Sequence, residues 1–239
     1  MIYNVGNRIM NTYIYPTEAG YIMIDTGYEK SLAGVEKKLN KKGVKLSDVK
    51  YVFLTHAHDD HAGFLNELLN KNKELKVIIS DKAMPTLKKG QNSFDGGCST
   101  AFAWVFCKLM ALVGKAEHRF PSVEDCFMDR FIEITEENKS QLETLLDGKI
   151  LFTPGHTKDS ISIQKGDKIF CGDAAMNGLP SSKRFTIWIE NISDFAKSWE
   201  KMLSTDAKII YPAHGKPFLK TDLAKYKAKI SKIKLRKLK

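Results

Sequence analysis

The sequence predicts an α+β fold in which apolar strands end in loops that carry histidine or aspartate. Residues 50–55 (KYVFLT) form a β-branched and aromatic run typical of a buried strand, and residues 63–70 (GFLNELLN) space their apolar side chains as a helix does. Residues 150–163, 168–176 and 208–218 repeat the first pattern, since each contains an apolar segment that runs into a turn marked by Gly or Pro. Because no Gly/Ser-rich or Pro-rich linker interrupts the 239 residues, we expect a single domain over residues 1–239.

The turn after the first of these strands holds half of the six histidines of the chain. His56, His58 and His61 lie with Asp60 in the stretch LTHAHDDHAG, residues 54–63. Like groups placed side by side repel one another, and each needs a partner when it is buried, so the cluster is costly unless it binds something. Imidazole nitrogen and carboxylate oxygen are ligands that zinc, iron and manganese accept. The cluster therefore predicts a metal site.

Further candidate ligands follow the later strands. His156 stands in a Thr-Pro-Gly-His turn, Asp173 in a Gly-Asp pair, and His214 in Pro-Ala-His-Gly, whereas His118 has no such context. Ligands of α/β sheets gather in the loops at the strand ends, because a rigid scaffold holds those loops. Seven candidate ligands exceed the needs of one tetrahedral zinc ion. They suit two metal ions that share one carboxylate and leave positions open for water and substrate.

Together these motifs resemble those of the metallo-β-lactamase superfamily of metallohydrolases, and they occur in the order found there. Residues 21–27 (YIMIDTG) look like the first motif of that superfamily, and the resemblance extends from about Asn11 to Phe218. It implies a four-layer αββα sandwich, with two β-sheets face to face and helices outside. The strand-rich regions before His56 and after Lys149 fit two such sheets.

The resemblance also implies a role for each candidate residue. The first metal ion would be held by His56, His58 and His156, the second by Asp60, His61 and His214, and both by Asp173 as a bridge. We expect two divalent metal ions, zinc first, with iron or manganese as alternatives. Asp25 would orient a ligand or its loop through hydrogen bonds. Metal-bound hydroxide would attack a small ester, thioester or lactone, and Asp60 would take or pass on a proton as a catalytic group.

The reaction has alternatives within the same resemblance. Asp173 stands where class B1 β-lactamases carry cysteine, and residues 174–177 lack the tyrosine that follows the bridging aspartate of acyl-homoserine lactonases. Neither of those activities is therefore favoured. Persulfide dioxygenases share the run of histidines but use a single iron, held by two His and one Asp, to activate oxygen. A metal-dependent nuclease or phosphodiesterase is a weaker alternative, since only the basic C-terminus supports it.

Two segments between the motifs are candidates for shaping the substrate pocket. Residues 92–130 form an insertion whose apolar part, residues 98–114, predicts a helix that is buried, covers the metals, or pairs two copies as a homodimer. In residues 177–188, Lys183 or Arg184 is placed to bind a substrate carboxylate. A third segment, which begins with Ser193 as its N-cap, predicts a helix that serves packing.

The formal charge of +10 lies almost wholly in the C-terminal tail, which has ten Lys or Arg and one acid from Lys216 onward. Residues 216–239 space apolar side chains along one face, so we predict a basic C-terminal helix with a solvated lysine face. A nucleic-acid partner is therefore not expected, and a small-molecule substrate is. The N-terminus lacks the pattern of a secretion signal, the four cysteines show no framework spacing, and the longest apolar run is too short to span a membrane. These features predict a cytoplasmic protein.

Overall fold

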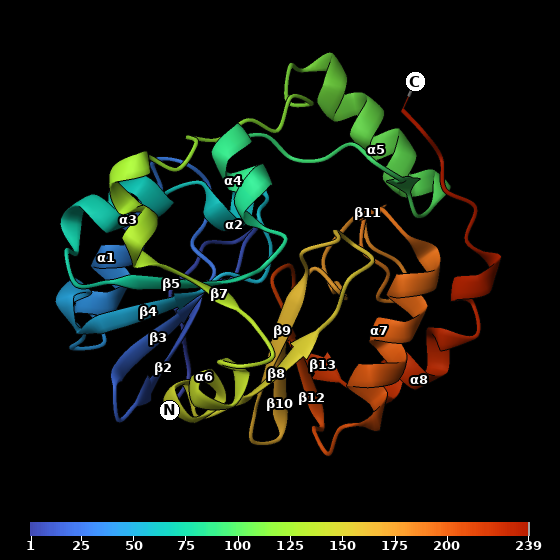
Figure 1. Ribbon diagram of the computed structural model, residues 1–239. Coiled ribbons are helices and arrows are strands. Elements are labelled where there is room, and N and C mark those ends of the chain that lie inside the picture. The colour runs from blue at the N-terminus through green and yellow to red at the C-terminus, as the bar shows by residue number, and fades with distance from the viewer. Residues whose placement is uncertain (239) are drawn as a thin grey trace. The chain divides into compact units, whose positions relative to one another are not determined.

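The structure, a computed structural model, describes residues 1–238 and forms two compact units (Figure 1). Unit 1 comprises Met1–Asn92 and Arg119–Lys149, and unit 2 comprises Ser93–His118 and Ile150–Lys239. The segment 92–130, predicted as one insertion, is thus divided between the units. Each unit contains a β-sheet and helices, as the α+β prediction requires.

Unit 1 is built on a six-stranded sheet with the order β1-β2-β3-β4-β5-β7. The strands are β1 Tyr3–Asn4, β2 Tyr13–Thr17, β3 Gly20–Ile24, β4 Val49–Phe53, β5 Lys76–Ser80 and β7 Phe131–Ile134. Strand β2 is antiparallel to both β1 and β3, whereas β3, β4, β5 and β7 run parallel to one another. Because parallel strands end at a common edge, the residues after β3 and β4 emerge side by side: Ile24 pairs with Phe53, and Asp25 N–H donates to Phe53 O.

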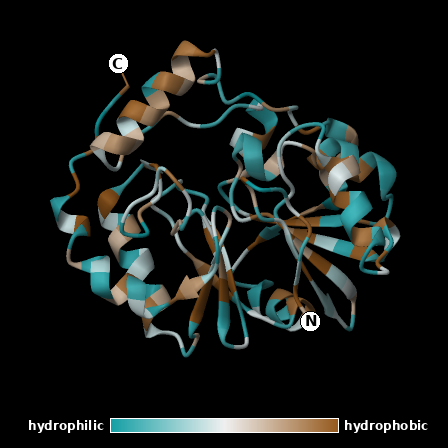
Figure 2. Cartoon of the chain, turned by 180° about the vertical axis from the view of Figure 1, so that it is seen from behind, coloured by the Kyte–Doolittle hydropathy of each residue, from teal (hydrophilic) through white to brown (hydrophobic). Residues whose placement is uncertain are grey.

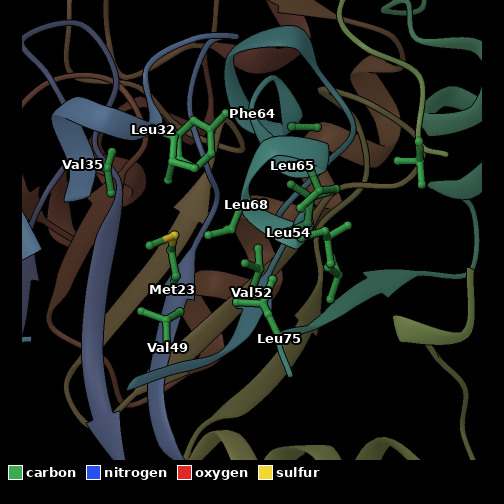
Figure 3. Close-up of a cluster of buried hydrophobic side chains, with 14 of the residues drawn as sticks. Met23, Leu32, Val35, Val49, Val52, Leu54, Phe64, Leu65, Leu68 and Leu75 are labelled. Carbon is green, nitrogen blue, oxygen red and sulfur yellow. The ribbon is translucent and has the colours of Figure 1, made fainter. Parts of the chain in front are cut away.

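Helices of unit 1 bury apolar stripes against this sheet. They are α1 Leu32–Asn40, α2 Asp59–Ala62, α3 Leu65–Lys71, α4 Met84–Lys89 and α6 Lys139–Leu146, with 3-10 turns at Leu46–Asp48 and Asp125–Arg130. Figure 3 shows Leu32 and Val35 of α1 and Leu65 and Leu68 of α3 in one cluster with strand residues such as Val52. Each fully buried aliphatic side chain contributes about 1.5–3 kcal/mol, so this cluster anchors the loops at the sheet edge.

Unit 2 contains a five-stranded sheet with the order β13-β12-β10-β9-β8. The strands are β8 Lys149–Phe152, β9 Ile161–Lys165, β10 Lys168–Gly172, β12 Ile209–Pro212 and β13 Phe218–Leu219. Strands β10 and β12 are parallel neighbours, with Gly172 paired to Pro212. The residues that follow them therefore lie at one edge, as in unit 1. A separate two-stranded sheet pairs β6 Gly97–Cys98 with β11 Trp188–Ile189.

The helices of unit 2 are α5 Ala101–Leu112, α7 Ile192–Ser204 and α8 Thr221–Lys227, with a 3-10 turn at Ile230–Lys232. Figure 1 shows α7 and α8 beside the strands of this unit. Their apolar faces form one core with β10 and β12, in which Phe195, Trp199 and Met202 of α7 are fully buried. The helix cap is Asn191, whose side chain accepts from Asp194 N–H, rather than the predicted Ser193. The prediction of a packing helix is confirmed, with an earlier start.

Two predicted helices differ from the structure. The run 98–114 forms α5, but Ala103 is its only buried residue, so the prediction of a buried helix is wrong. The segment 216–239 is not one basic helix: β13, α8 and the 3-10 turn share it, and Arg236 then pairs with Cys98. The pairing of Arg236 with β6 requires an extended backbone, so the helix cannot continue to the end of the segment. The apolar inner face is confirmed, since Leu223 and Ile230 are buried.

Within the described residues 1–238, no helix has both the length and the apolar character that crossing a membrane requires.

Candidate metal centre

The turn after β4 brings His56 and His58 together in unit 1. Both are buried, and His56 Nε2 lies 3.1 Å from His58 Nδ1. Two nitrogens bound to one tetrahedral zinc ion lie about 3.3 Å apart, as follows from Zn–N bonds of about 2.0–2.1 Å. The spacing of these two ring nitrogens therefore fits ligands of a single cation.

His61 lies on the short helix α2, with Asp60 beside it. The predicted loop is thus partly helical, and the hydrogen bonds that His58 O accepts from the N–H groups of His61 and Ala62 close its first turn. His61 Nε2 is 3.7 Å from Asp60 Oδ1, and the His61 ring lies tilted by 50° against that of His56 with 3.9 Å between ring centroids. All four predicted residues of the run are therefore assembled within unit 1.

The buried carboxylate of Asp25 fixes the orientation of His61 through hydrogen bonds. This carboxylate accepts from Thr55 N–H at 2.7 Å and from the Thr55 hydroxyl at 2.9 Å, and it lies 2.9 Å from His61 Nδ1. A carboxylate can only accept here, so His61 Nδ1 carries the proton and Nε2 keeps its lone pair for a metal ion. The predicted orienting contact of Asp25 is present in the geometry.

Thr55 is a residue that the sequence analysis did not single out. Its hydroxyl hydrogen goes to Asp25, so Thr55 Oγ1 can accept from His56 Nδ1 at 3.1 Å. That contact leaves His56 Nε2 as the ligand atom. Asp59, also missed, is held by Asn92: Asp59 N–H donates to Asn92 Oδ1 and Asn92 Nδ2 donates to Asp59 Oδ1. The only sequence signal for either residue is adjacency to the histidine run.

In unit 2, His156 is oriented by a backbone carbonyl. His156 Nδ1 lies 2.7 Å from Trp188 O on β11, so it donates its proton there, and Thr186 Oγ1 is 3.4 Å away. The remaining nitrogen, Nε2, faces Asp173 Oδ2 at 3.8 Å. Residue type gives no sign of a carbonyl partner, so this support could not be predicted from sequence.

Asp173 and His214 come together because β10 and β12 are parallel neighbours. Asp173 Oδ1 lies 3.6 Å from His214 Nε2, while its other oxygen faces His156. Trp199 Nε1 donates to Ala174 O at 2.7 Å and so holds the chain just after Asp173. The two carboxylate oxygens thus face two different histidines within unit 2. Histidine nitrogens and carboxylate oxygens of both units are of the kind that can hold a metal ion.

Comparison with known proteins assigns this arrangement to a family. Residues 5–214 match the metallo-beta-lactamase superfamily. The chain belongs to that superfamily. The resemblance inferred from the five motifs is thereby confirmed, and the family membership supports the expectation of a hydrolase-type enzyme that binds metal.

Curated relatives of this superfamily member are distant. A "Beta-lactamase-like protein 2 homolog" of Caenorhabditis elegans is 26% identical over 216 residues, which cover 86% of this chain and 55% of the relative. The "Probable metallo-hydrolase YqjP" of Bacillus subtilis is 25% identical over 82% of this chain and 64% of its own length. The chain thus spans less than two thirds of these two relatives.

Solved structures confirm the metallo-β-lactamase fold. Family protein TTHA1429 of Thermus thermophilus has a TM-score of 0.69 at 18% identity and covers 97% of this chain and 79% of its own. Superfamily protein ST1585 of Sulfolobus tokodaii has a TM-score of 0.62 at 21% identity over 95% and 85% of the two chains. At these identities the likeness establishes the fold alone.

The loop of the superfamily member that was predicted to meet substrate has an internal role in the structure. The Arg184 guanidinium donates to Asp222 Oδ2 at 2.7 and 2.9 Å and lies over the Phe218 ring, so its charge is already engaged. Lys183 is exposed. Substrate binding by Lys183 or Arg184 stays a prediction, and of the two side chains Lys183 is the more accessible.

The turn that carries His156 is braced by β11 and α7. Gly155 O accepts from the backbone N–H groups of Glu190 and Asn191, and Lys158 N–H donates to the Glu190 carboxylate at 2.7 Å. Burial raises the pKa of Glu190, against the opposing hydrogen bonds from Ser93 and Lys158. These hydrogen bonds lie wholly in unit 2 and support the turn that carries His156.

Proposed function

We propose that this protein is a binuclear metal-dependent hydrolase of a small ester, thioester or lactone. In this proposal the four residues assembled in unit 1 and the three in unit 2 form one centre: His56, His58 and His156 hold one ion, and Asp60, His61 and His214 the other. Zinc is the metal we propose, with iron or manganese as the alternatives. Family membership and the donor types support this assignment.

The observation that carries the two-metal proposal is the pose of Asp173. One oxygen faces His156 Nε2 at 3.8 Å, and the other faces His214 Nε2 at 3.6 Å. A carboxylate that serves one ion needs a single oxygen or chelates with both toward the same point. Oxygens that face histidines assigned to different ions are the arrangement expected of a bridge.

The residues of the chain would divide the chemistry as follows. Two divalent cations, when bound, lower the pKa of water to about 7 and polarise an ester carbonyl. Asp60, which is only partly buried, is placed to take a proton from water or pass it to the leaving group as the catalytic acid–base. The contacts of Asp25 and Trp188 O keep His61 and His156 in the tautomer that a metal needs.

Metal content of three variants tests the proposal without knowledge of the substrate. We expect about two metal ions per wild-type chain. Asp173→Ala should lower occupancy of both sites, whereas His61→Ala and His214→Ala should each lose about one ion and most hydrolysis of p-nitrophenyl acetate. Asp167→Ala, which removes an exposed carboxylate from the turn before β10, is the matched control and should retain both ions.

The same variants separate this function from the single-iron alternative. A mononuclear dioxygenase would keep its metal in His61→Ala and His214→Ala and would consume oxygen with glutathione persulfide. Full metal content and full hydrolysis in both histidine variants, with circular dichroism unchanged, would show the binuclear assignment to be wrong.

We also propose that α5 pairs two copies of the chain. The exposed apolar side chains of α5 and its C-cap, at positions 102, 105, 106, 109, 112 and 113, form one stripe at helical spacing, and Figure 2 colours most of this helix as hydrophobic. Exposed stripes of this kind mark interaction surfaces. A cytoplasmic location and a single domain over residues 1–239 stay predictions from the sequence.

A further inference from the structure

The short helix α2 begins without a cap from its own N-terminal residue. His58, which precedes its first turn, has an extended backbone, but its side chain makes no capping hydrogen bond. Helix caps are usually Ser, Thr, Asp or Asn, whose side-chain oxygen accepts from an N–H of the first turn. His58 is instead a candidate metal ligand. The N–H groups at the start of α2 therefore need an acceptor from another part of the chain.

Asn92 supplies that acceptor, although it lies 33 positions beyond the start of the helix. Its Oδ1 accepts from Asp59 N–H at 2.8 Å, and its Nδ2 donates to Asp59 Oδ1 at 2.7 Å. A backbone N–H can only donate and an ionised carboxylate can only accept, so their common partner must offer one acceptor and one donor. A side-chain amide carries both on neighbouring atoms. The hydrogen bonds between Asn92 and Asp59 are therefore reciprocal.

The backbone that leads to Asn92 is itself held within unit 1. Helix α4 ends at Gly90, whose φ is +64° and whose carbonyl accepts from Phe120 N–H at 3.0 Å. A Cβ at position 90 would lie 2.5 Å from Phe120 O, so only glycine permits this approach. Gln91 then bridges to Arg119, and Asn92 is 6% exposed. Asn92 thus reaches α2 from an anchored segment.

The opposite end of α2 is held by Thr26. His61 O accepts from Thr26 N–H at 2.8 Å and from the Thr26 hydroxyl at 2.6 Å. A helix of four residues has too few internal hydrogen bonds to be stable alone, so the contacts at its two ends set its position. Between those ends α2 carries Asp60 and His61, with Asp60 Oδ1 3.7 Å from His61 Nε2.

We propose that Asn92 is a positioning residue of the candidate metal centre and acts by capping α2. It holds the backbone and the carboxylate of Asp59, and through them the chain from which Asp60 and His61 extend. Asp25 orients the ring of His61, whereas Asn92 places the backbone that carries it. The consequence for Asp60 and His61 as ligands rests on the proposed hydrolase. The capping of α2 does not.

A swap of the two side chains tests the pair in the full-length protein. In the swapped variant, Asn92→Asp with Asp59→Asn, the carboxylate at position 92 can accept from the N–H of residue 59 and from its new amide. Both hydrogen bonds return, and the net charge is that of the wild type. Asn92→Leu removes both bonds at similar side-chain size. Hydrogen exchange of α2 amides in metal-free protein should be several-fold faster in Asn92→Leu and close to wild type in the swapped variant.

Zinc affinity measures the consequence for the candidate centre. Asn92→Leu should bind zinc about 10–100-fold more weakly, which is the usual effect of losing a group that supports metal ligands, and the swapped variant should recover most of that affinity. Asn138→Asp is the matched control. Asn138 also accepts from a backbone N–H and donates to an oxygen within unit 1, at Thr135 and Glu133, so its replacement should leave zinc affinity unchanged.

Three results would overturn the proposal. If Asn92→Leu keeps the exchange rates of the wild type, Asn92 does not cap α2, and if it keeps the zinc affinity of the wild type, Asn92 does not position the ligands. If the swapped variant is as impaired as Asn92→Leu, the reciprocal pair is not the cause. A wild type that binds no zinc would overturn the hydrolase, and the exchange rates of metal-free protein would still decide whether Asn92 caps α2.

Discussion

At the scale of single residues, Asp25 combines a strained backbone with hydrogen bonds that orient His61. Its backbone has φ of 58°, a left-handed conformation that costs about 1–2 kcal/mol for most residues and less for Asp. The carboxylate, fully buried, is fixed by two donors from Thr55 and by the ring of His61. The local strain is therefore held by hydrogen bonds that set the tautomer of a candidate ligand.

Replacing Asp25 should weaken metal binding without removing a ligand. We expect Asp25→Asn to lower the affinity for zinc by about 10–100-fold, because an amide nitrogen cannot accept from His61 Nδ1. Competition with a chromogenic chelator measures the change. Asp81→Asn alters an exposed carboxylate that likewise follows a strand of unit 1, and it should bind zinc as the wild type does. Equal affinities for all three proteins would rule out the orienting role.

At the scale of elements, both groups of candidate ligands depend on parallel strands that end side by side. Strands β3 and β4 bring Asp25 to Thr55, and β10 and β12 bring Asp173 to His214. The turn between β8 and β9, which carries His156, is not placed by a pair of parallel strands. It packs against the start of α7 instead. Gly155 permits that approach: its φ is +131°, and a Cβ there would lie 2.3 Å from Phe195 N.

Gly155→Ala should therefore displace His156. We expect a loss of stability of about 1–3 kcal/mol from crowding, added to about 1 kcal/mol from backbone strain, together with a lower metal content. Gly166→Ala is the matched control, since Gly166 also has positive φ but nothing within 4 Å of a built Cβ. Urea unfolding and elemental analysis of the pair separate crowding from strain. If the two variants behave alike, the close approach to α7 is unimportant.

Tyr15 links β2 to the end of α6 within unit 1. Its hydroxyl donates to Leu146 O at 3.0 Å, and Tyr15→Phe should cost about 1–2 kcal/mol at neutral pH because a buried carbonyl loses its donor. Burial, with the nearby Asp147, raises the pKa of Tyr15 above its ordinary value of 10.0. The folded state keeps the proton that the unfolded state loses, so this stability is present below pH 10.0 and declines above it. Urea unfolding of the wild type and Tyr15→Phe at neutral pH and above pH 10.0 measures this. The difference in their free energies of unfolding should be smaller at the alkaline pH, and a constant difference would contradict the prediction.

At the scale of the whole molecule, charge and exposed apolar surface are unevenly distributed. The C-terminal tail carries ten of the basic residues, and two of them lie in contacts that fasten the tail: Lys227 with Glu200, and Lys220 with Leu203 O. The exposed apolar stripe of α5 is the larger departure from an ordinary surface. Association through that stripe is therefore what we propose for this protein, rather than a nucleic-acid partner.

Charges placed on the stripe should separate the copies. Phe102 and Leu109 are each 56% exposed, so Phe102→Glu with Leu109→Glu should leave the fold intact and convert a dimer to monomers. Leu219→Glu, at a residue 61% exposed on β13, is the control and should remain dimeric. Sedimentation velocity distinguishes the states. A wild type that is monomeric at every concentration would show that α5 does not pair two copies.

The sequence by itself determined the candidate ligands, the order of the motifs and most of the strands that precede them. A histidine-rich run after an apolar strand is a local pattern, and its chemistry follows from residue type, so seven candidate ligands could be named before any contact was known. The superfamily and the α+β class could also be predicted, because the motifs and the strand patterns are local features of the sequence. Apolar faces such as that of α7 were also predictable, because helical spacing encodes them.

Tertiary structure alone decided which partners hold those residues. Two such contacts join positions far apart in the chain or use backbone atoms. They are the hydrogen bond from His156 to the Trp188 carbonyl and the pairing of Arg184 with Asp222. Residue type carries no mark of such a partner, since every residue has a carbonyl and cations pair with whichever acid the fold supplies. The exposure of α5 and the short C-terminal helix were likewise set by packing and by the pairing of Arg236 with β6, which override local propensity.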